Sequence, residues 1–227
     1  MSKTDRLLDA IEVETGKNPR ASVIWMHGLG ADGNDFVPVV DELALDGATA
    51  IRFVFPHAPM RPVTINNGYV MRAWYDVSLG DLEGNSRRAD ERGVRESQAH
   101  IAALIEREGQ RGIAPEQIVL AGFSQGGAIA LQTGLRYPHG LAGVMALSTY
   151  LPLAESLPRE ASPANKATPI FMAHGIYDPV VPMVMGAGSM TLLTGLGYTV
   201  EWRQYPMPHS VCPQEIEDIG AWLRKVL

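Results

Sequence analysis

The sequence predicts an α/β fold, with a mostly parallel central sheet and helices on both faces. Short apolar runs alternate with segments of helical periodicity along nearly the whole chain, which is typical of βαβ units. The runs are almost continuously apolar, as in strands that are covered on both faces. The chain has 227 residues, of which 46% are hydrophobic, so we expect residues 1–227 to form a single domain.

The predicted strands are the apolar runs, each of which ends in a polar or Gly-rich loop. In order they are SVIWMH (22–27), AIRFVFP (50–56), QIVLAGFS (117–124), AGVMALS (142–148), TPIFMAHG (168–175) and YTVEWRQYP (198–206). The last run alternates more than the others, so we expect it nearer an edge of the sheet. Residues 56–77 interrupt the rhythm with the turn sequence Asn66-Asn67-Gly68. We predict a small hairpin there, near the mouth of the site.

Helical patterns fill the segments between the strands. Residues 89–109 place Val94, Ile101 and Ile105 at helical spacing, and Gly109 is a typical C-terminal stop. Three further segments are predicted as helices: 125–138, 183–197 and 213–227. This order of strands and helices places the functional loops at the carboxyl ends of the strands.

Charge and composition indicate which classes of partner and which cellular location to expect. The formal net charge is -6 and the pI is about 5.5, which disfavours nucleic acid and acidic membrane surfaces as partners. The single cysteine, Cys212, cannot form an intramolecular disulfide. Residues 1–16 lack the apolar core of a secretory signal, and no run approaches the roughly 20 apolar residues that span a bilayer. We therefore expect a cytoplasmic protein without stable membrane insertion.

The loop HGLGADG (27–33) has the glycine spacing G-x-G-x-x-G, which elsewhere binds a dinucleotide. That function also requires an acidic residue at the end of the second strand, where it would bind the ribose hydroxyls. The second predicted strand ends in Phe-Val-Phe-Pro-His at 53–57, without an acid. The sequence therefore disfavours a nicotinamide or flavin site.

A second glycine motif predicts a nucleophile. The sequence GFSQG (122–126) matches G-x-S-x-G and lies directly between a predicted strand and a predicted helix, which is the context of a nucleophile elbow. The serine of such an elbow lies on a strained turn, so small neighbours are needed where the backbones approach closely. Ser124 is therefore the predicted nucleophile.

A serine hydroxyl needs a base, and the base needs a carboxylate that orients it. In α/β-hydrolases these residues follow the chain order serine, acid, histidine. The histidines after Ser124 are His139, His174 and His209, and the acids between Ser124 and His209 are Glu155, Glu160, Asp178 and Glu201.

Asp178 is the predicted acid, because its loop, HGIYDPVVP, follows a strand at the carboxyl edge of the sheet. Glu155 and Glu160 lie in a Pro-rich loop, and Glu201 lies within a predicted strand. His209 is the predicted base, since it is the only histidine that follows all of these acids.

Acyl transfer also requires backbone N–H groups that stabilise the tetrahedral oxyanion. One donor comes from the residue after the nucleophile and the other from a loop after an early strand. HGLGADG follows the first predicted strand, so we expect the oxyanion hole to consist of the Leu29 and Gln125 amides. His27 would then hold the loop.

The blocks HGLGADG, RAWYD (72–76), GFSQGGAIAL, HGIYDPVVP and PHSVCPQEIEDIGAWL lie in this order over nearly the whole chain. Together they resemble the carboxylesterase and acyl-protein thioesterase family of α/β-hydrolases, also called phospholipase/carboxylesterase. The resemblance implies an α/β-hydrolase without a large cap domain, with the triad Ser124, Asp178 and His209 and oxyanion donors at Leu29 and Gln125. It implies no metal and no organic cofactor.

The sequence departs from this family immediately before the predicted base. The family usually has glycine there, whereas this chain has Pro208, which fixes φ and lacks an N–H. We therefore expect the His209 loop to be stiffer or differently tilted.

The resemblance implies cleavage of carboxylic esters with short to medium acyl chains, and some members cleave thioesters of lipidated proteins or lysophospholipids. We expect a serine carboxylesterase, with those two substrates as the alternatives. A non-catalytic binding protein on this scaffold is disfavoured, because such relatives usually lack a triad residue and all three are present.

Substrate contacts and assembly are less constrained by the sequence. Trp74, Val180 and Val181 lie near the inferred mouth of the site, and we expect them to line an acyl pocket, the alternative being that they are core residues. The sequence leaves both a monomer and a homodimer open.

Overall fold

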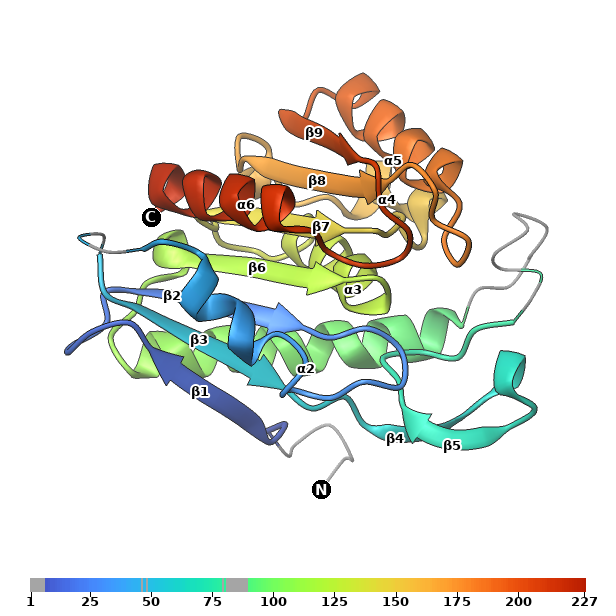
Figure 1. The fold of residues 1–227 in the computed structure, drawn as a ribbon, viewed down its shortest axis with the longest axis horizontal. Helices are drawn as coiled ribbons and strands as arrows, with labels where there is room; N and C mark the ends of the chain where they lie inside the picture. Colours follow the sequence, from blue (N-terminus) through green and yellow to red (C-terminus); the bar gives the residue numbers. More distant parts are fainter. Residues whose placement is uncertain (1–6, 46, 48, 79, 81–89) are drawn as a thin grey trace.

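The structure is a computed structural model that describes residues 7–45, 47, 49–78, 80 and 90–227 (Figure 1). In this part of the chain a seven-stranded sheet has the order β1-β3-β2-β6-β7-β8-β9. The strands are β1 (Ala10–Glu14), β2 (Ala21–Met26), β3 (Ile51–Pro56), β6 (Ile118–Phe123), β7 (Gly143–Leu147), β8 (Ile170–Gly175) and β9 (Val200–Tyr205). Only the pair β1 and β3 is antiparallel among these neighbours. The predicted mostly parallel sheet is confirmed.

All of the predicted strands are present, with ends within two residues of the prediction, and β9 is an edge strand as expected. The sequence analysis missed β1. Its sequence, AIEVE, is half-exposed and alternates, because an antiparallel edge strand is covered on one face only. Such a strand contains no continuous apolar run by which the sequence could reveal it.

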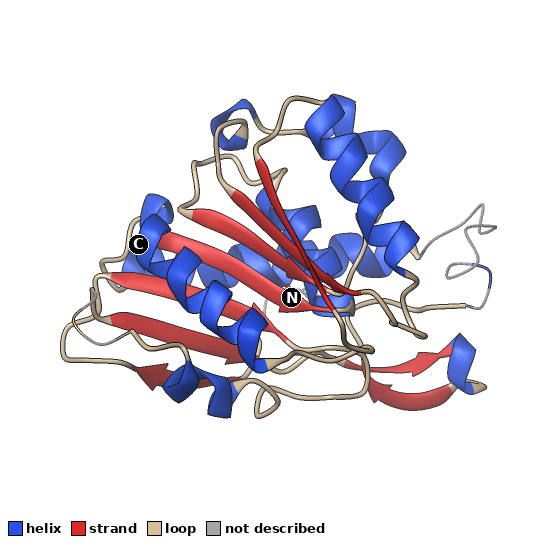
Figure 2. Cartoon of the chain, turned by 45° about the horizontal axis from the view of Figure 1, so that its top comes forward, coloured by secondary structure: helices blue, strands red, loops and turns tan. Residues whose placement is uncertain are grey.

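The helices cover both faces of the sheet, as predicted (Figure 2). They are α2 (Glu91–Gln110), α3 (Gln125–Gly134), α4 (Leu157–Glu160), α5 (Met183–Gly195) and α6 (Pro213–Val226), with short 3-10 turns at Val37–Glu42, Thr64–Asn66, Pro115–Gln117, Ala154–Ser156 and Pro163–Asn165. Two buried clusters fill the space on the two faces. One contains side chains of α2, α3 and α5, and the other contains side chains of α6 and of the turn at Val37–Glu42. Ala89, at the start of the predicted helix 89–109, lies outside the described residues.

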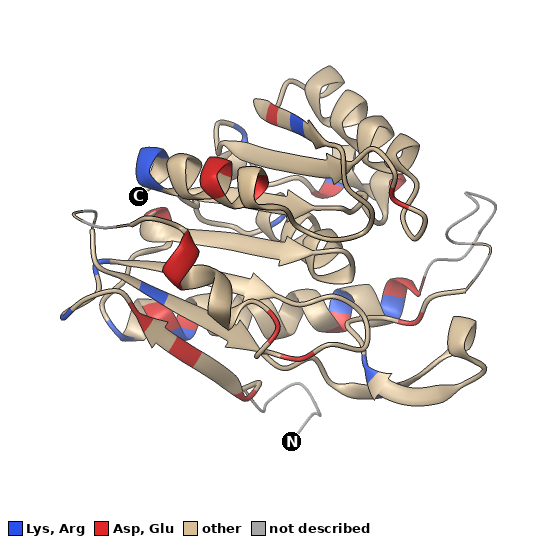
Figure 3. Cartoon of the chain, in the orientation of Figure 1, with Lys and Arg blue, Asp and Glu red and all other residues tan. Residues whose placement is uncertain are grey.

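Charged residues lie away from the centre of the sheet. The strands β6, β7 and β8 contain no charged residue (Figure 3), as expected for strands buried on both faces. On β3, the largely buried Arg52 is paired with Glu14 and Glu108, each at 2.9 Å. Two carboxylates therefore offset the cost of burying this guanidinium group.

The predicted hairpin is present at the carboxyl end of the sheet (Figure 1). Its strands, β4 (Met60–Val63) and β5 (Tyr69–Arg72), are antiparallel. Asn67 and Gly68 form the turn with positive φ values of 55° and 76°, a conformation that asparagine and glycine tolerate better than other residues. The hairpin returns the chain to residues 73–76, beside the elbow.

Glu215 on α6 makes the stability of the fold pH-dependent. Its side chain is fully buried, and the N–H group of Cys212 is the one hydrogen-bonding group near its carboxyl oxygens among the described residues, at poor geometry. Burial is the main cause that raises the Glu215 pKa from 4.5 to about 8. Between these two values the unfolded chain releases a proton that the folded chain keeps, so the free energy of unfolding falls as the pH rises.

We expect Glu215→Gln to remove this pH dependence. At pH 8 the variant should be more stable than the wild type by on the order of a few kcal/mol, and near pH 4.5 the two should be similar. Urea unfolding at both pH values measures the difference. Glu217→Gln is the matched control, because Glu217 is exposed on the same helix. A stability difference that is the same at both pH values would contradict the prediction.

Candidate active site

Ser124 lies on the turn between β6 and α3, with φ 54° and ψ -121°. A non-glycine residue in this region is strained and persists only where the surroundings enforce it. A Cβ at Gly122 would lie 2.2 Å from the Gly126 carbonyl carbon, and a Cβ at Gly126 would lie 2.2 Å from the Met26 oxygen. Both contacts are sterically forbidden, so the two glycines are required by this turn.

His209 and Asp178 lie beside Ser124 and form a continuous hydrogen-bonded series with it. The His209 Nε2 atom is 3.0 Å from Ser124 Oγ, and Nδ1 is 2.6 Å from Asp178 Oδ2. The imidazole ring also packs on Phe123, with the ring centroids 4.7 Å apart. The three side chains come from loops after β6, β8 and β9, which end at the same edge of the sheet.

The two loops that carry the acid and the base are joined by their backbones. Ile176 N–H donates to the Tyr205 oxygen at 2.9 Å, and Tyr177 N–H donates to the Met207 oxygen at 3.2 Å. These bonds extend the pairing of β8 and β9 beyond the sheet. The relative position of Asp178 and His209 is therefore fixed by main-chain contacts.

Asp178 is held as a buried carboxylate with each oxygen in use. Oδ1 accepts the N–H groups of Val180 and Val181 at 2.8 and 2.9 Å, and Oδ2 faces His209. Its side chain has no exposed surface. Two backbone donors and the imidazole therefore fix the orientation of the Asp178 side chain.

The sequence analysis missed a contact of His174 with this acid. His174 is fully buried, and its Nε2 is 2.9 Å from the Val181 oxygen and 3.5 Å from Asp178 Oδ2. Burial lowers the His174 pKa, so the neutral ring donates Nε2–H to Val181. His174 thus holds the carbonyl group of Val181, the residue whose N–H group donates to Asp178. The only signal in the sequence was its place at the end of a strand, four residues before the acid.

Pro208 does not displace His209 from its partners. The Pro208 oxygen accepts the N–H of Ser210 at 2.9 Å, and both imidazole nitrogens keep their contacts with Ser124 and Asp178. Gly175 passes close beneath this loop, since a Cβ there would lie 2.5 Å from the Pro208 oxygen. A proline before the histidine is thus compatible with the hydrogen-bonded series.

The loop HGLGADG lies against the elbow. A Cβ at Gly28 would be 3.5 Å from the Ser124 Cβ. Within the described residues, the N–H groups of Leu29 and Gln125 make no turn or loop hydrogen bond. The structure thus brings the loop of the first predicted oxyanion donor next to the nucleophile turn that contains the second.

His27 fixes the start of this loop. Its Nε2 accepts the Ala58 N–H at 3.1 Å, and Nδ1 lies 2.7 Å from the Gly28 oxygen. Burial lowers the His27 pKa to about 4, so the ring is neutral near pH 7 and donates its Nδ1–H to Gly28. The expected role of His27 in holding the loop agrees with these contacts.

The Gln125 side chain connects the elbow to residues 74 and 75. Its Oε1 accepts the Trp74 N–H at 2.8 Å, and its Nε2 donates to the Tyr75 oxygen at 2.6 Å. The Trp74 indole N–H donates to the His27 oxygen at 2.9 Å. Gln125, Trp74 and His27 therefore form one buried network beneath the elbow and the glycine loop, which the sequence motifs did not reveal.

The residues that were expected to line an acyl pocket lie at different depths. Trp74 is fully buried in the core and its indole is committed to the buried network, which favours the alternative that it is a core residue. Val181 is 4% exposed, whereas Val180 is 47% exposed. The Val181 N–H group donates a hydrogen bond to Asp178. The exposed apolar residues near the acid that were not predicted are Ile176, Tyr177 and Val184.

The family model described as phospholipase/carboxylesterase matches residues 8–227. The chain belongs to the phospholipase/carboxylesterase family. It is therefore a hydrolase with the α/β-hydrolase fold, and the described residues form no cap domain beside the sheet and its helices.

Proteins named as thioesterases and as carboxylesterases are similar to this chain. Acyl-protein thioesterase 1 of Gibberella zeae is 41% identical, with 91% of each chain covered. A protein of Oryza sativa subsp. japonica named "Probable carboxylesterase" is 34% identical, with 98% of this chain and 84% of that protein covered. The crystal structure of Zea mays acyl-protein thioesterase 2 is 28% identical and has a TM-score of 0.82, with 96% of this chain and 98% of that chain covered.

None of the helices in the described part of the chain combines the length and the apolar character required to cross a bilayer.

Proposed function

We propose that this hydrolase cleaves carboxylic esters with short to medium acyl chains through an acyl-enzyme on Ser124. The observation that carries the proposal is the series from Ser124 Oγ to His209 to Asp178, with distances of 3.0 and 2.6 Å, on a strained turn beside the glycine loop. An unactivated serine hydroxyl is a weak nucleophile near pH 7. A hydrogen-bonded imidazole with a buried carboxylate behind it supplies the activation.

In the first half of the reaction, His209 Nε2 accepts the proton of Ser124 while Oγ attacks the ester carbonyl carbon. The charge that develops on the carbonyl oxygen is stabilised by the N–H groups of Leu29 and Gln125. When the tetrahedral intermediate collapses, the bond to the alcohol oxygen breaks and His209 returns its proton to that oxygen. The alcohol leaves and the acyl group remains on Ser124.

In the second half, a water molecule attacks the acyl-enzyme with His209 as its base. A second tetrahedral intermediate forms at the same donors and collapses to the carboxylic acid and free Ser124. Throughout the cycle, Asp178 keeps the proton of the neutral imidazole on Nδ1 and stabilises the imidazolium that forms.

Acylated proteins with thioester-linked chains are the second candidate substrate, with lysophospholipids as a further one. The thioesterase names of the Gibberella zeae and Zea mays relatives favour it. Exposed apolar side chains within six positions of Asp178 in the sequence, namely Ile176, Tyr177, Val180 and Val184, are available to contact an acyl chain in either case. The ratio of kcat/KM for a thioester and an oxygen ester with the same acyl chain separates the two substrates.

We also propose a cytoplasmic location, which the single cysteine supports. The proposed function is compatible with both a monomer and a homodimer.

A fluorophosphonate probe tests the proposed function without knowledge of the substrate. We expect a single adduct on Ser124, detected by intact mass and peptide mapping, and its loss in His209→Ala. Ser148→Ala is the matched control, because Ser148 also ends a strand with a positive φ but lies outside the hydrogen-bonded series. A folded protein that forms no adduct, or forms one elsewhere, would favour a non-catalytic binding protein on this scaffold.

A further inference from the structure

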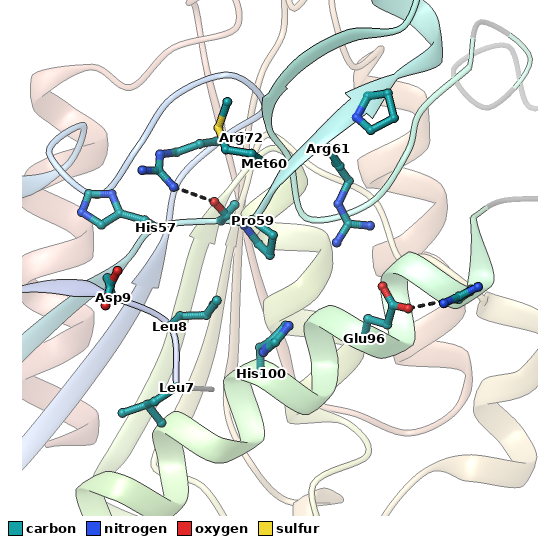
Figure 4. Close-up of a pocket in the computed structure, with 13 residues that line it drawn as sticks. Leu7, Leu8, Asp9, His57, Pro59, Met60, Arg61, Arg72, Glu96 and His100 are labelled. Carbon is teal, nitrogen blue, oxygen red and sulfur yellow. Dashed lines mark hydrogen bonds and ion pairs between the residues drawn. The ribbon is translucent and has the colours of Figure 1, made fainter. Parts of the chain in front are cut away.

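A cavity of about 910 Å³ lies outside the candidate active site (Figure 4). It is bounded by residues 7–9 before β1, residues 57–59 after β3, the first residues of the hairpin and one side of α2. Ser124, His209 and Asp178 do not line it, and neither does Leu29. The cavity is therefore a second possible binding site, separate from the proposed chemistry.

Arg61 on the wall of this cavity is largely buried and poorly paired. Its side chain is 17% exposed, and its nearest carboxylate oxygen, on Asp90, is 3.8 Å from Nη1, which exceeds hydrogen-bonding distance. Its Nε has no partner among the described residues. A guanidinium group carries several N–H donors and cannot lose its charge in a protein, so burial without acceptors is unfavourable.

Arg72 supplies a second guanidinium group to the same cavity. Its Nη1 donates to the Ala58 oxygen at 2.9 Å, and no carboxylate of the described residues forms an ion pair with it. In Figure 4, Arg72 lies on one side of Pro59 and Arg61 on the other. Two cationic groups with free donors thus border one space.

The other charged residues of the cavity do not neutralise the positive charge of Arg61 and Arg72. Arg92 and Glu96 pair with each other at 2.8 Å. Asp9 is the remaining carboxylate in the lining, and it lies near His57 (Figure 4). The His57 Nδ1 accepts the Gly33 N–H at 3.0 Å, so this ring nitrogen is already occupied. An anion would therefore lie nearer Arg61, on the side of Pro59 away from Asp9 (Figure 4).

An apolar wall adjoins the cationic groups. Leu7, Leu8, Pro59 and Met60 line the cavity, and Met60 is 59% exposed. The wall near Arg72 is fixed in place, because the Arg72 backbone oxygen accepts the Gly30 N–H at 2.9 Å. A preformed site loses less conformational entropy on binding.

We propose that this cavity binds a small organic anion with a hydrocarbon tail. Its oxyanion group, a carboxylate or a phosphate, accepts hydrogen bonds from Arg61, and Arg72 adds positive charge from the other side of Pro59. The tail lies against Leu8 and Pro59. Planar guanidinium groups suit both oxyanions, because parallel N–H donors match their oxygens. An inorganic ion has no hydrocarbon group and would leave the apolar wall without a contact.

Calorimetric titration of the full chain tests this proposal with three probes: hexanoate, monohexyl phosphate and inorganic phosphate. We expect at least one probe with a tail to bind more tightly than inorganic phosphate, and the probe preferred identifies the oxyanion. Arg61→Gln should weaken that binding by about tenfold or more, since it removes a charge-assisted donor. The measurement requires no turnover, so its result is independent of the proposed esterase function.

Two further variants make the result specific. Arg92→Gln is the matched control and should change the affinity little, because the charge of Arg92 is already paired with Glu96. Leu8→Ser should weaken binding of the probes with tails and leave inorganic phosphate unaffected. No binding by any probe, equal binding with and without a tail, or equal binding by wild type and a folded Arg61→Gln variant would overturn the proposal.

Discussion

Ser124→Ala is expected to lower kcat by about 10⁴ to 10⁶. The substitution removes the oxygen that would form the acyl-enzyme and leaves the imidazole without a proton to accept. Alanine has the same Cβ, so the strained φ of 54° is neither relieved nor increased. The one interaction lost is the 3.0 Å contact with His209. Initial rates on a chromogenic short-chain ester, together with thermal unfolding, separate lost chemistry from lost structure.

Ser148→Ala provides the comparison that this result needs. Ser148 follows β7 with a φ of 48°, and its buried Oγ has no hydrogen-bond partner among the described residues. The same substitution in a similar backbone conformation should therefore leave kcat near that of the wild type. An active Ser124→Ala enzyme, free of contaminating esterase, would rule out the acyl-enzyme mechanism.

The sequence predicts the centre of this fold better than its edges. The strands β6, β7 and β8 are buried along their whole length or nearly so, and burial on both faces requires the continuous apolar runs that were recognised. β1 has one covered face and a sequence of only five residues, so its pattern is weak. The predicted helix 125–138 is shorter in the structure and ends at Gly134, because helical periodicity does not define an end.

The sequence also indicates which side chains meet at the site, but not what supports them. Chain order selected Ser124, Asp178 and His209, and the structure places His209 within hydrogen-bonding distance of both Ser124 and Asp178. The contact between Gln125 and the Trp74 and Tyr75 backbone joins residues about 50 positions apart. Such contacts depend on how loops pack after the sheet has formed, and no local motif records them.

Trp74 illustrates the same limit. A large apolar residue near a site can line a pocket or fill the core, and the sequence is the same in both cases. The structure buries Trp74 completely and uses its indole N–H to hold the His27 oxygen. Its effect on the proposed site is therefore to support the glycine loop.

Asp178→Asn is expected to lower kcat by about 10⁴, although it changes a single atom of the side chain. Oδ1 accepts two backbone N–H groups, from Val180 and Val181, so an asparagine must keep its oxygen in that position. Its NH₂ group then faces His209 Nδ1, which has to become an acceptor. The imidazole proton moves to Nε2, and that nitrogen can no longer accept the proton of Ser124.

The rate of fluorophosphonate labelling and kcat on an ester should fall together in Asp178→Asn, because both depend on the base. Glu155→Gln and Glu201→Gln are the matched controls, since these acids also lie between Ser124 and His209 in the chain and make no contact with His209 in the structure. The effect should also exceed any loss of stability, because both backbone donors to residue 178 keep an acceptor. If Asp178→Asn is fully active, the tautomer of His209 is fixed by something other than this carboxylate, and the order of the three side chains along the chain has no mechanistic meaning.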